Sequence, residues 1–266
     1  MGAESLNGAR RDAWLWRLCA TGLAFVIFGV GGLVLRLLVF PLQSLLPGDA
    51  QERQRRARST IKRAFRFFVK LLVVMRVMDL EFKGVEKLGR AGQLIFVNHP
   101  TLLDVVLVVG YSGGYPNCIV RHGLSVSPFM RGPIRAAGYI TNDEGMDMLE
   151  RAAEVLRQGE PLIIFPEGTR TAVGAMPSFH RGASAIALRG AAMVTPVLIR
   201  TNARGLSKGD AWYRIPRRRL RYVIEVGDDI DPAQWRDHYP PPLASRKMND
   251  FLHDYFLRGL TRNECT

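Results

Sequence analysis

Residues 93–104 read QLIFVNHPTLLD, an apolar run that ends in Asn98, His99 and Pro100. An uninterrupted apolar run of this length is typical of a strand buried on both faces of a sheet. Pro100 suits the first position of a helix, because its φ is fixed and its missing N–H is not needed there. We therefore expect a buried strand that ends at Asn98, a helix that begins near Pro100, and His99 at the junction.

Strand-like and helix-like stretches alternate beyond this segment. PLIIFP (161–166) and MVTPVLI (193–199) are typical of strands, and MDMLERAAEVLRQG (146–159) is typical of a helix. RKMNDFLHDYFLRGL (246–260) closes the chain as an amphipathic helix. The alternation predicts an α/β fold with a mixed, largely parallel sheet flanked by helices.

The N-terminal part of the chain has a different character. LCATGLAFVIFGVGGLVL (18–35) carries no charge and is long enough for a membrane-spanning helix, and the apolar character resumes after Arg36. The segment is either one tilted span or a helical hairpin bent around Gly31-Gly32 and Pro41, with a buried helix of a soluble protein as the less favoured alternative. We expect an apolar, membrane-associating helical segment.

A basic run follows, ERQRRARSTIKRAFR (52–66). Directly after an apolar segment, such a run is expected to lie against anionic lipid headgroups on the cytoplasmic side. Basic residues on both flanks favour a hairpin or an interfacial segment with both ends in the cytoplasm. We therefore divide the chain into a membrane-associating helical segment (1–66) and an α/β domain (67–266).

The bulk composition narrows the possible partners and sites. The net charge of +13 suits a polyanion, namely nucleic acid, an anionic membrane or an acidic protein. No zinc finger, recognition helix or aromatic RNA-binding run is present, which argues against nucleic acid. Cys19, Cys118 and Cys265 are far apart and odd in number, which argues against a disulfide framework or a zinc site and favours a reducing compartment.

His99 and Asp104 carry the first candidate chemistry. If a strand ends at Asn98 and a helix follows, the Asp104 carboxylate can reach back to one imidazole nitrogen of His99. A histidine oriented in this way can take a proton from an attacking hydroxyl, as in acyl transfer. The pattern H-x-x-x-x-D is weak by itself, because a hydrogen-bonded structural pair is the more common explanation.

PLIIFPEGTRT (161–171) is the second candidate, an apolar strand that runs into Glu167, Gly168, Thr169 and Arg170. Gly168 allows the backbone to approach a ligand closely. Arg170 can bind a phosphate through two parallel hydrogen bonds. An ordinary turn with a surface arginine would explain this stretch almost equally well if it stood alone.

Together, NHPTLLD (98–104) and FPEGTR (165–170) resemble the first and third motifs of the glycerolipid acyltransferases, which include the 1-acylglycerol-3-phosphate acyltransferases. RHGLSVSPFMRGPIRAAGYI (121–140) is similar to the family's second block, and FHRGA (179–183) to the segment after the third motif. MVTPVLI is similar to the fourth motif. The resemblance covers roughly residues 80 to 200, and an N-terminal apolar segment is also typical of such enzymes.

The resemblance implies transfer of a fatty acyl group from a thioester to the hydroxyl of a lysophospholipid, giving phosphatidic acid from 1-acylglycerol-3-phosphate. His99 would be the general base and Asp104 its partner. Arg170, with the backbone of Glu167, Gly168 and Thr169, would position the phosphate of the acceptor. The acyl donor would be acyl-CoA or acyl-ACP as a substrate, so that no cofactor and no metal are expected.

Two departures from the family's second block bear on the acceptor. Arg121 stands where a lysine is frequent, and Thr141 follows the block where an arginine is frequent, so that Arg135 is the substitute if there is one. These positions help to hold the head group in the family, and their change leaves open a different acceptor such as lyso-ornithine lipid.

A second alternative is a catalytically silent lipid-binding protein at the membrane surface. The presence of both His99 and Asp104 argues against it. In either case we expect the chain at the cytoplasmic membrane, with its α/β domain on the cytoplasmic face, and with acyl carrier protein as a further acidic partner.

Overall fold

The computed structural model describes residues 13–142, 145–171, 176–202, 211 and 213–261. These residues form a seven-stranded sheet in the order β1-β7-β6-β2-β5-β3-β4. The strands are β1 (Met78–Lys83), β2 (Gln93–Val97), β3 (Asn117–Val120), β4 (Ile140–Thr141), β5 (Leu162–Ile164), β6 (Met193–Thr201) and β7 (Leu220–Val226). All neighbouring strands are parallel except β6 and β7, which confirms the expected mixed, largely parallel sheet.

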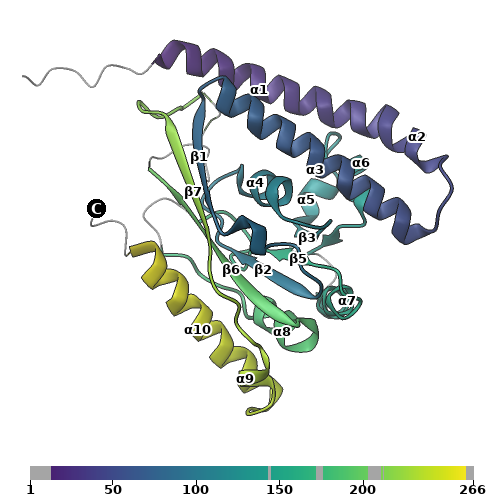
Figure 1. The fold of residues 1–266 in the computed structure, drawn as a ribbon, viewed down its shortest axis with the longest axis vertical. Coiled ribbons are helices and arrows are strands. Elements are labelled where there is room, and N and C mark those ends of the chain that lie inside the picture. Colours follow the sequence, from purple (N-terminus) through teal and green to yellow (C-terminus); the bar gives the residue numbers. More distant parts are fainter. Residues whose placement is uncertain (1–12, 143–144, 172–175, 203–210, 212, 262–266) are drawn as a thin grey trace, which may run out of the picture.

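Helices cover both faces of this sheet (Figure 1). The helical elements are α1 (Trp14–Val34), the π-helical η1 (Leu35–Val39), α2 (Phe40–Ser44), α3 (Ala50–Val74), the 3₁₀ turn η2 (Val85–Lys87), α4 (Asp104–Tyr111), α5 (His122–Ser125), α6 (Arg131–Ala137), α7 (Gly145–Arg157), α8 (Arg181–Gly190), α9 (Ala233–Arg236) and α10 (Pro241–Thr261). The helices α3 and α4 pack on one face, and α7, α8 and α10 pack on the other.

The central strand β2 explains this two-sided packing. All five of its residues are buried. Ile95 and Val97 belong to the apolar cluster under α3 and α4, whereas Leu94 and Phe96 belong to the cluster under α7, α8 and α10. Because successive side chains of a strand point to opposite faces, only a continuous apolar run can fill both layers.

The apolar N-terminal segment is a helix that continues from Trp14 to Ser44, and it is long and apolar enough to cross a bilayer. The α-helix continues through Gly31-Gly32 without a break. The π-helical turn just before Pro41 opens the backbone where the proline ring would otherwise clash, so that the helix passes through this residue. The expected positions of a bend are therefore wrong.

A helical hairpin does form, but its second arm is α3. The indole Nε1 of Trp16 donates to the carbonyl of Met75 at 2.8 Å, and Gln43 Nε2 donates to Thr60 Oγ1 at 2.7 Å. These contacts set α1–α2 and α3 antiparallel, side by side across the sheet (Figure 1). The boundary expected between residues 66 and 67 falls inside the continuous helix α3.

One arginine of the basic run points into the protein. Arg58 is buried, forms an ion pair with Glu160 at 2.7 Å, and donates from Nε to the carbonyl of Ala137 at 2.8 Å. Arg53 and Arg63 are exposed. Arg58 thus anchors the basic run to the domain, while other arginines of the run face solvent. The helical period, rather than the composition of the run, decides which arginine points inward.

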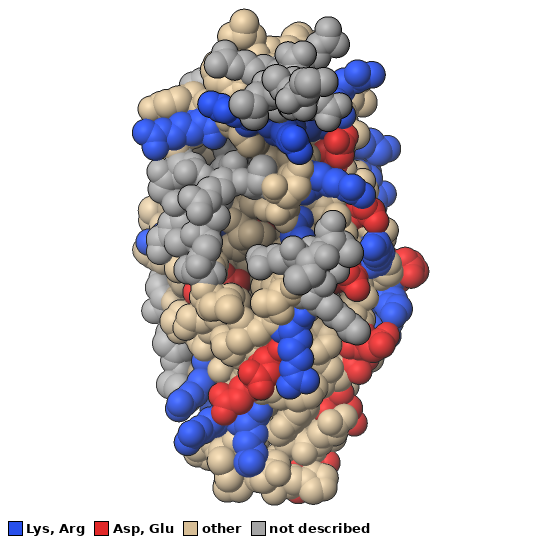
Figure 2. Space-filling model, turned by 90° about the vertical axis from the view of Figure 1, so that its left-hand side faces the viewer, with Lys and Arg blue, Asp and Glu red and all other residues tan. Residues whose placement is uncertain are grey.

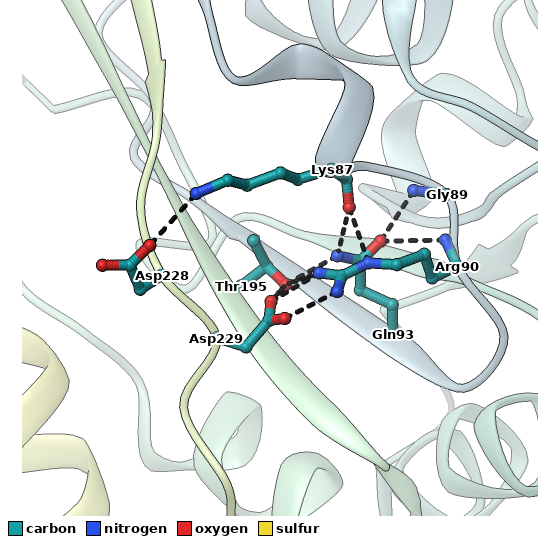
Figure 3. A network of polar contacts seen from close by, with 7 residues as sticks. All are labelled: Lys87, Gly89, Arg90, Gln93, Thr195, Asp228 and Asp229. Atoms are coloured by element: carbon teal, nitrogen blue, oxygen red, sulfur yellow. Dashed lines mark hydrogen bonds and ion pairs between the residues drawn. The ribbon is translucent and has the colours of Figure 1, made fainter.

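A polar network fixes the amino-terminal ends of β2 and β6 (Figure 3). Gln93, at the start of β2, is fully buried and donates to Thr195 Oγ1 at 2.6 Å. Its Oε1 accepts from the backbone N–H groups of Gly89 and Arg90. Arg90 in turn forms an ion pair with Asp229, which also accepts from Thr195. This network lies at the edge of the sheet opposite the carboxyl end of β2.

Candidate active site

The carboxyl end of β2 carries the first candidate residues. Asn98, directly after the strand, donates to the carbonyl of Ile199 at 2.9 Å and accepts from its N–H at 2.7 Å. This two-way bond holds the end of β2 against β6. The chain then leaves the sheet at His99, beside the end of the parallel strand β5, so that the two candidate motifs meet at one edge.

The structure places His99 and Asp104 in direct contact. Nδ1 of His99 lies 2.8 Å from Oδ2 of Asp104, and the side chain of Asp104 is fully buried. Burial raises the pKa of Asp104, and the hydrogen bonds from His99 and Thr101 oppose that rise. Because a carboxylate only accepts hydrogen bonds, Nδ1 carries the proton, and Nε2 is the nitrogen that can accept one from a substrate.

The helix after His99 begins later than Pro100. Residues 98–103 form no helix, and α4 starts at Asp104. The Asp104 carboxylate reaches back to the N–H of Thr101 at 2.7 Å and to its hydroxyl at 2.6 Å. These bonds give the chain a local alternative to a helical turn, which is why the expected start at Pro100 is wrong.

Two further residues support the pair, and the sequence pattern alone does not single them out. The hydroxyl of Tyr222 on β7 donates to Thr101 Oγ1 at 3.1 Å. Tyr222 is fully buried. A line of hydrogen bonds therefore runs from Tyr222 through Thr101 to Asp104 and His99. Thr101 lies inside the NHPTLLD motif, whereas nothing in the sequence connects Tyr222 with it.

Glu167 connects the two motif loops. Its Oε1 accepts from the backbone N–H of His99 at 2.8 Å, and its Oε2 accepts from the hydroxyl of Thr171. The N–H of Thr171 donates to the carbonyl of His99 at 3.1 Å. Burial raises the pKa of Glu167 to about 7. Its carboxylate is thus occupied in holding the histidine loop.

The other residues of the FPEGTR loop are more open. Gly168 has a φ of 63°, which favours glycine, and a side chain there would meet the ring of His180 at 3.1 Å. Thr169 is exposed and Arg170 is partly buried. The left-handed turn at Gly168 leaves its backbone exposed at the rim of the cavity beside His99.

An apolar cavity of about 500 Å³ adjoins His99. Its roof comes from one face of α1 and one face of α3, through residues such as Ala24, Phe28, Phe65 and Leu72. The first and last lining positions on each helix are eleven positions apart, Arg17 to Phe28 and Ile61 to Leu72. At 1.5 Å per residue the cavity extends for roughly 16 Å along the helices.

Few polar side chains line this cavity. His99, Arg121, Asn142 and His180 are among them, and Gly168 contributes backbone. Arg135 lies on the exposed side of α6 and is not among the lining residues, and neither is Arg170. Within the described part of the chain, no group of three or more His, Cys, Asp or Glu side chains could hold a metal ion.

The sequence pattern does not single out His180 as a site residue. This histidine precedes α8, lines the cavity and lies against Gly168. The resemblance of FHRGA to a family segment was the one available signal, and it pointed to the segment rather than to the histidine.

Comparisons with known proteins find acyltransferases. The model of the family described as Acyltransferase matches residues 79–200. A 1-acyl-sn-glycerol-3-phosphate acyltransferase of Pseudomonas aeruginosa is 26% identical, over 84% of this chain and 95% of that protein. One of Helicobacter pylori is 26% identical, over 65% of this chain and 75% of that protein.

A solved structure shares the fold. The crystal structure of the 1-acyl-sn-glycerophosphate acyltransferase PlsC from Thermotoga maritima superposes with a TM-score of 0.70 at 20% identity. The superposition covers 95% of this chain and 96% of that one, so it includes the N-terminal helices as well as the α/β domain.

Proposed function

Because this chain is an acyltransferase of the glycerolipid acyltransferase family, we propose that it transfers a fatty acyl group from a thioester to the hydroxyl of a lysophospholipid. The acceptor we propose is 1-acylglycerol-3-phosphate, which would give phosphatidic acid. The hydrogen bond between His99 and Asp104, at the wall of a long apolar cavity, is the observation that carries this proposal.

In the proposed reaction, Nε2 of His99 takes the proton from the acceptor hydroxyl as its oxygen attacks the thioester carbonyl. Asp104 keeps the imidazole in the required tautomer and stabilises the imidazolium. When the tetrahedral intermediate collapses, the carbon–sulfur bond breaks and the imidazolium returns its proton to the leaving thiolate. The products are an ester and a free thiol, carried by coenzyme A or acyl carrier protein.

The cavity and its polar rim support the binding roles. We propose that the apolar cavity holds the acyl chain, because most of its lining is hydrocarbon. Arg121 lines the cavity and Arg170 lies two residues after Gly168, and both suit the acceptor phosphate. The backbone of Glu167, Gly168 and Thr169 would complete that site. Arg135 has no role in this proposal, because its side chain lies outside the cavity lining.

We further propose that α1–α2 lies in the cytoplasmic face of the membrane rather than across it. Apolar side chains such as Leu23, Val26, Val30 and Leu37 are exposed along its outer face. Its inner face packs against α3 and the domain. A spanning orientation would carry the arginines of α3 into hydrocarbon, where charged side chains are costly.

The test is acyl transfer by the purified protein in the presence of lysophosphatidic acid and acyl-CoA or acyl-ACP. We expect His99→Ala to lower kcat by about 10²–10⁴-fold, the usual contribution of a general base. Asp104→Asn should also lower kcat severely, because an amide cannot accept both the Nδ1–H and the Thr101 bonds. Membrane association should not change. Parent-like turnover by His99→Ala would refute the proposal.

Lyso-ornithine lipid is the second candidate acceptor. Arg121 is the one arginine of the second block that lines the cavity, so its contribution to phosphate binding can be tested directly. A screen of lysolipids with and without phosphate separates the candidates. Faster transfer to lyso-ornithine lipid than to lysophosphatidic acid would assign the phosphate-free acceptor. A preference for lysophosphatidic acid that falls in Arg121→Gln would support the phosphate site.

A further inference from the structure

Three exposed arginines lie at the end of the helical hairpin where α1 begins. Arg76 follows α3, and Arg217 and Arg218 lie just before β7. Their neighbours Arg219 and Arg221 form ion pairs with acidic residues of β1. Within the described residues, the side chains of Arg76, Arg217 and Arg218 have no acidic partner. We call these three residues the arginine patch.

The patch is assembled from distant parts of the chain by Arg17. This residue of α1 is buried, and its guanidinium donates to the carbonyls of Pro216, Arg217 and Arg218 at 3.1, 2.7 and 3.1 Å. Three hydrogen bonds to successive carbonyls hold the loop before β7 firmly against the start of α1. The side chains of Arg217 and Arg218 in this loop are exposed to solvent.

Exposed apolar side chains adjoin the patch. Leu15 is 72% exposed, Trp16 is 56% exposed and Val74, at the end of α3, is 79% exposed. Figure 1 shows the start of α1 and the starts of β1 and β7 together at one end of the molecule. In Figure 2 blue side chains gather in the upper part of the face, whereas lower down they alternate with red ones.

We propose that the arginine patch and these apolar side chains dock onto an anionic lipid bilayer. Tryptophan beside aliphatic residues and unpaired arginines is the composition that suits the boundary between headgroups and acyl chains. The arginines would contact lipid phosphates, while Leu15, Trp16 and Val74 enter the acyl boundary. This contact involves the C-terminal half of the chain and is additional to the outer face of α1–α2.

Arg214, Ile215 and Pro216, in the loop that carries Arg217 and Arg218, line the cavity beside Arg17. Docking would therefore bring one end of the cavity to the bilayer surface, where a lysolipid acceptor is found.

The experiment is cosedimentation of the full chain with vesicles of phosphatidylcholine, with and without phosphatidylglycerol. The variant is Arg217→Gln/Arg218→Gln, and the charge-matched control is Arg236→Gln/Arg246→Gln on the exposed surface of α9 and α10. Each arginine near an anionic surface contributes roughly a fivefold change in binding, about 1 kcal/mol. We expect the variant to bind anionic vesicles roughly twentyfold more weakly, and the control to bind like the parent.

On phosphatidylcholine alone all three proteins should bind alike, because the apolar contacts are unchanged. Equal losses in variant and control, or no loss in the variant, would overturn the proposal. Unchanged vesicle binding with slower transfer from acyl-ACP but not from acyl-CoA would assign the patch to the acidic carrier protein instead. Parent-like transfer in detergent micelles shows that the variant is folded. Vesicle binding needs no turnover, so failure of the proposed reaction would not affect this test.

Discussion

At the scale of single residues, His99 is held by groups that lie far from it in the sequence. Its backbone N–H is bound by Glu167, and its side-chain partner Asp104 is braced by Thr101 and, through Thr101, by Tyr222. Each of these supports is buried. A general base must keep its ring within hydrogen-bond reach of the reacting hydroxyl, and these bonds fix both the backbone and the ring.

Glu167 makes stability depend on pH. Burial raises its pKa from the ordinary 4.5 to about 7. Between these two pH values the carboxyl group of Glu167 keeps its proton in the folded protein, whereas it loses that proton in the unfolded chain. Its contribution to stability is present below pH ~4.5 and is lost as pH rises towards ~7, and it is on the order of 3 kcal/mol. We expect the thermal midpoint of the parent to fall across this window relative to that of Glu167→Gln. If the thermal midpoints of the parent and of Glu167→Gln changed with pH in the same way, Glu167 would not titrate in this window.

At the scale of elements, α3 serves two surfaces at once. One face roofs the cavity through Ile61, Phe65 and Leu72, and the opposite side carries exposed arginines. Arg58 anchors the helix through Glu160 and the carbonyl of Ala137. The position of the roof, and with it the shape of the cavity, therefore depends on a buried ion pair.

Arg58→Ala should destabilise the protein by about 3–5 kcal/mol, because Glu160 would be left buried without its partner. We expect the thermal midpoint to fall by roughly 10 °C. The exposed Arg63→Ala on the same helix is the control and should change stability by less than about 0.5 kcal/mol. A double replacement of Arg58 and Glu160 by methionine should recover part of the loss. Equal midpoints for the Arg58 and Arg63 variants would contradict the anchoring role.

At the scale of the whole molecule, a stabilising polar network and the candidate catalytic residues lie at opposite edges of the sheet. The network of Gln93, Arg90, Thr195 and Asp229 fixes the amino-terminal edge of β2 (Figure 3). His99 follows the other end of β2, roughly 20 Å away at 3.3 Å per residue. A substitution in the network should therefore change stability without altering the groups around His99.

Gln93→Leu should lower stability by about 1–3 kcal/mol, because it leaves the partly buried N–H groups of Gly89 and Arg90 without their acceptor and removes the buried bond to Thr195. The kcat of the folded fraction should match that of the parent, because no group near His99 is altered. Urea denaturation followed by an acyl-transfer assay below the transition measures both quantities. A large fall in kcat without a fall in stability would mean that the network acts on the site.

The sequence by itself determined the strand character of β2, the α/β class and the contact between His99 and Asp104. These follow from local rules: a buried strand needs a continuous apolar run, and five residues of chain keep a carboxylate within reach of an imidazole. Only the tertiary structure decided that Glu167 binds the backbone of His99, that Tyr222 supports Thr101, and that Arg58 points inward. It also decided that α3, rather than a bend at Pro41, closes the hairpin, and that Arg17 gathers the arginine patch. The physical reason is that hydrogen bonds between distant segments depend on strand order and helix packing, which no local pattern of residues encodes.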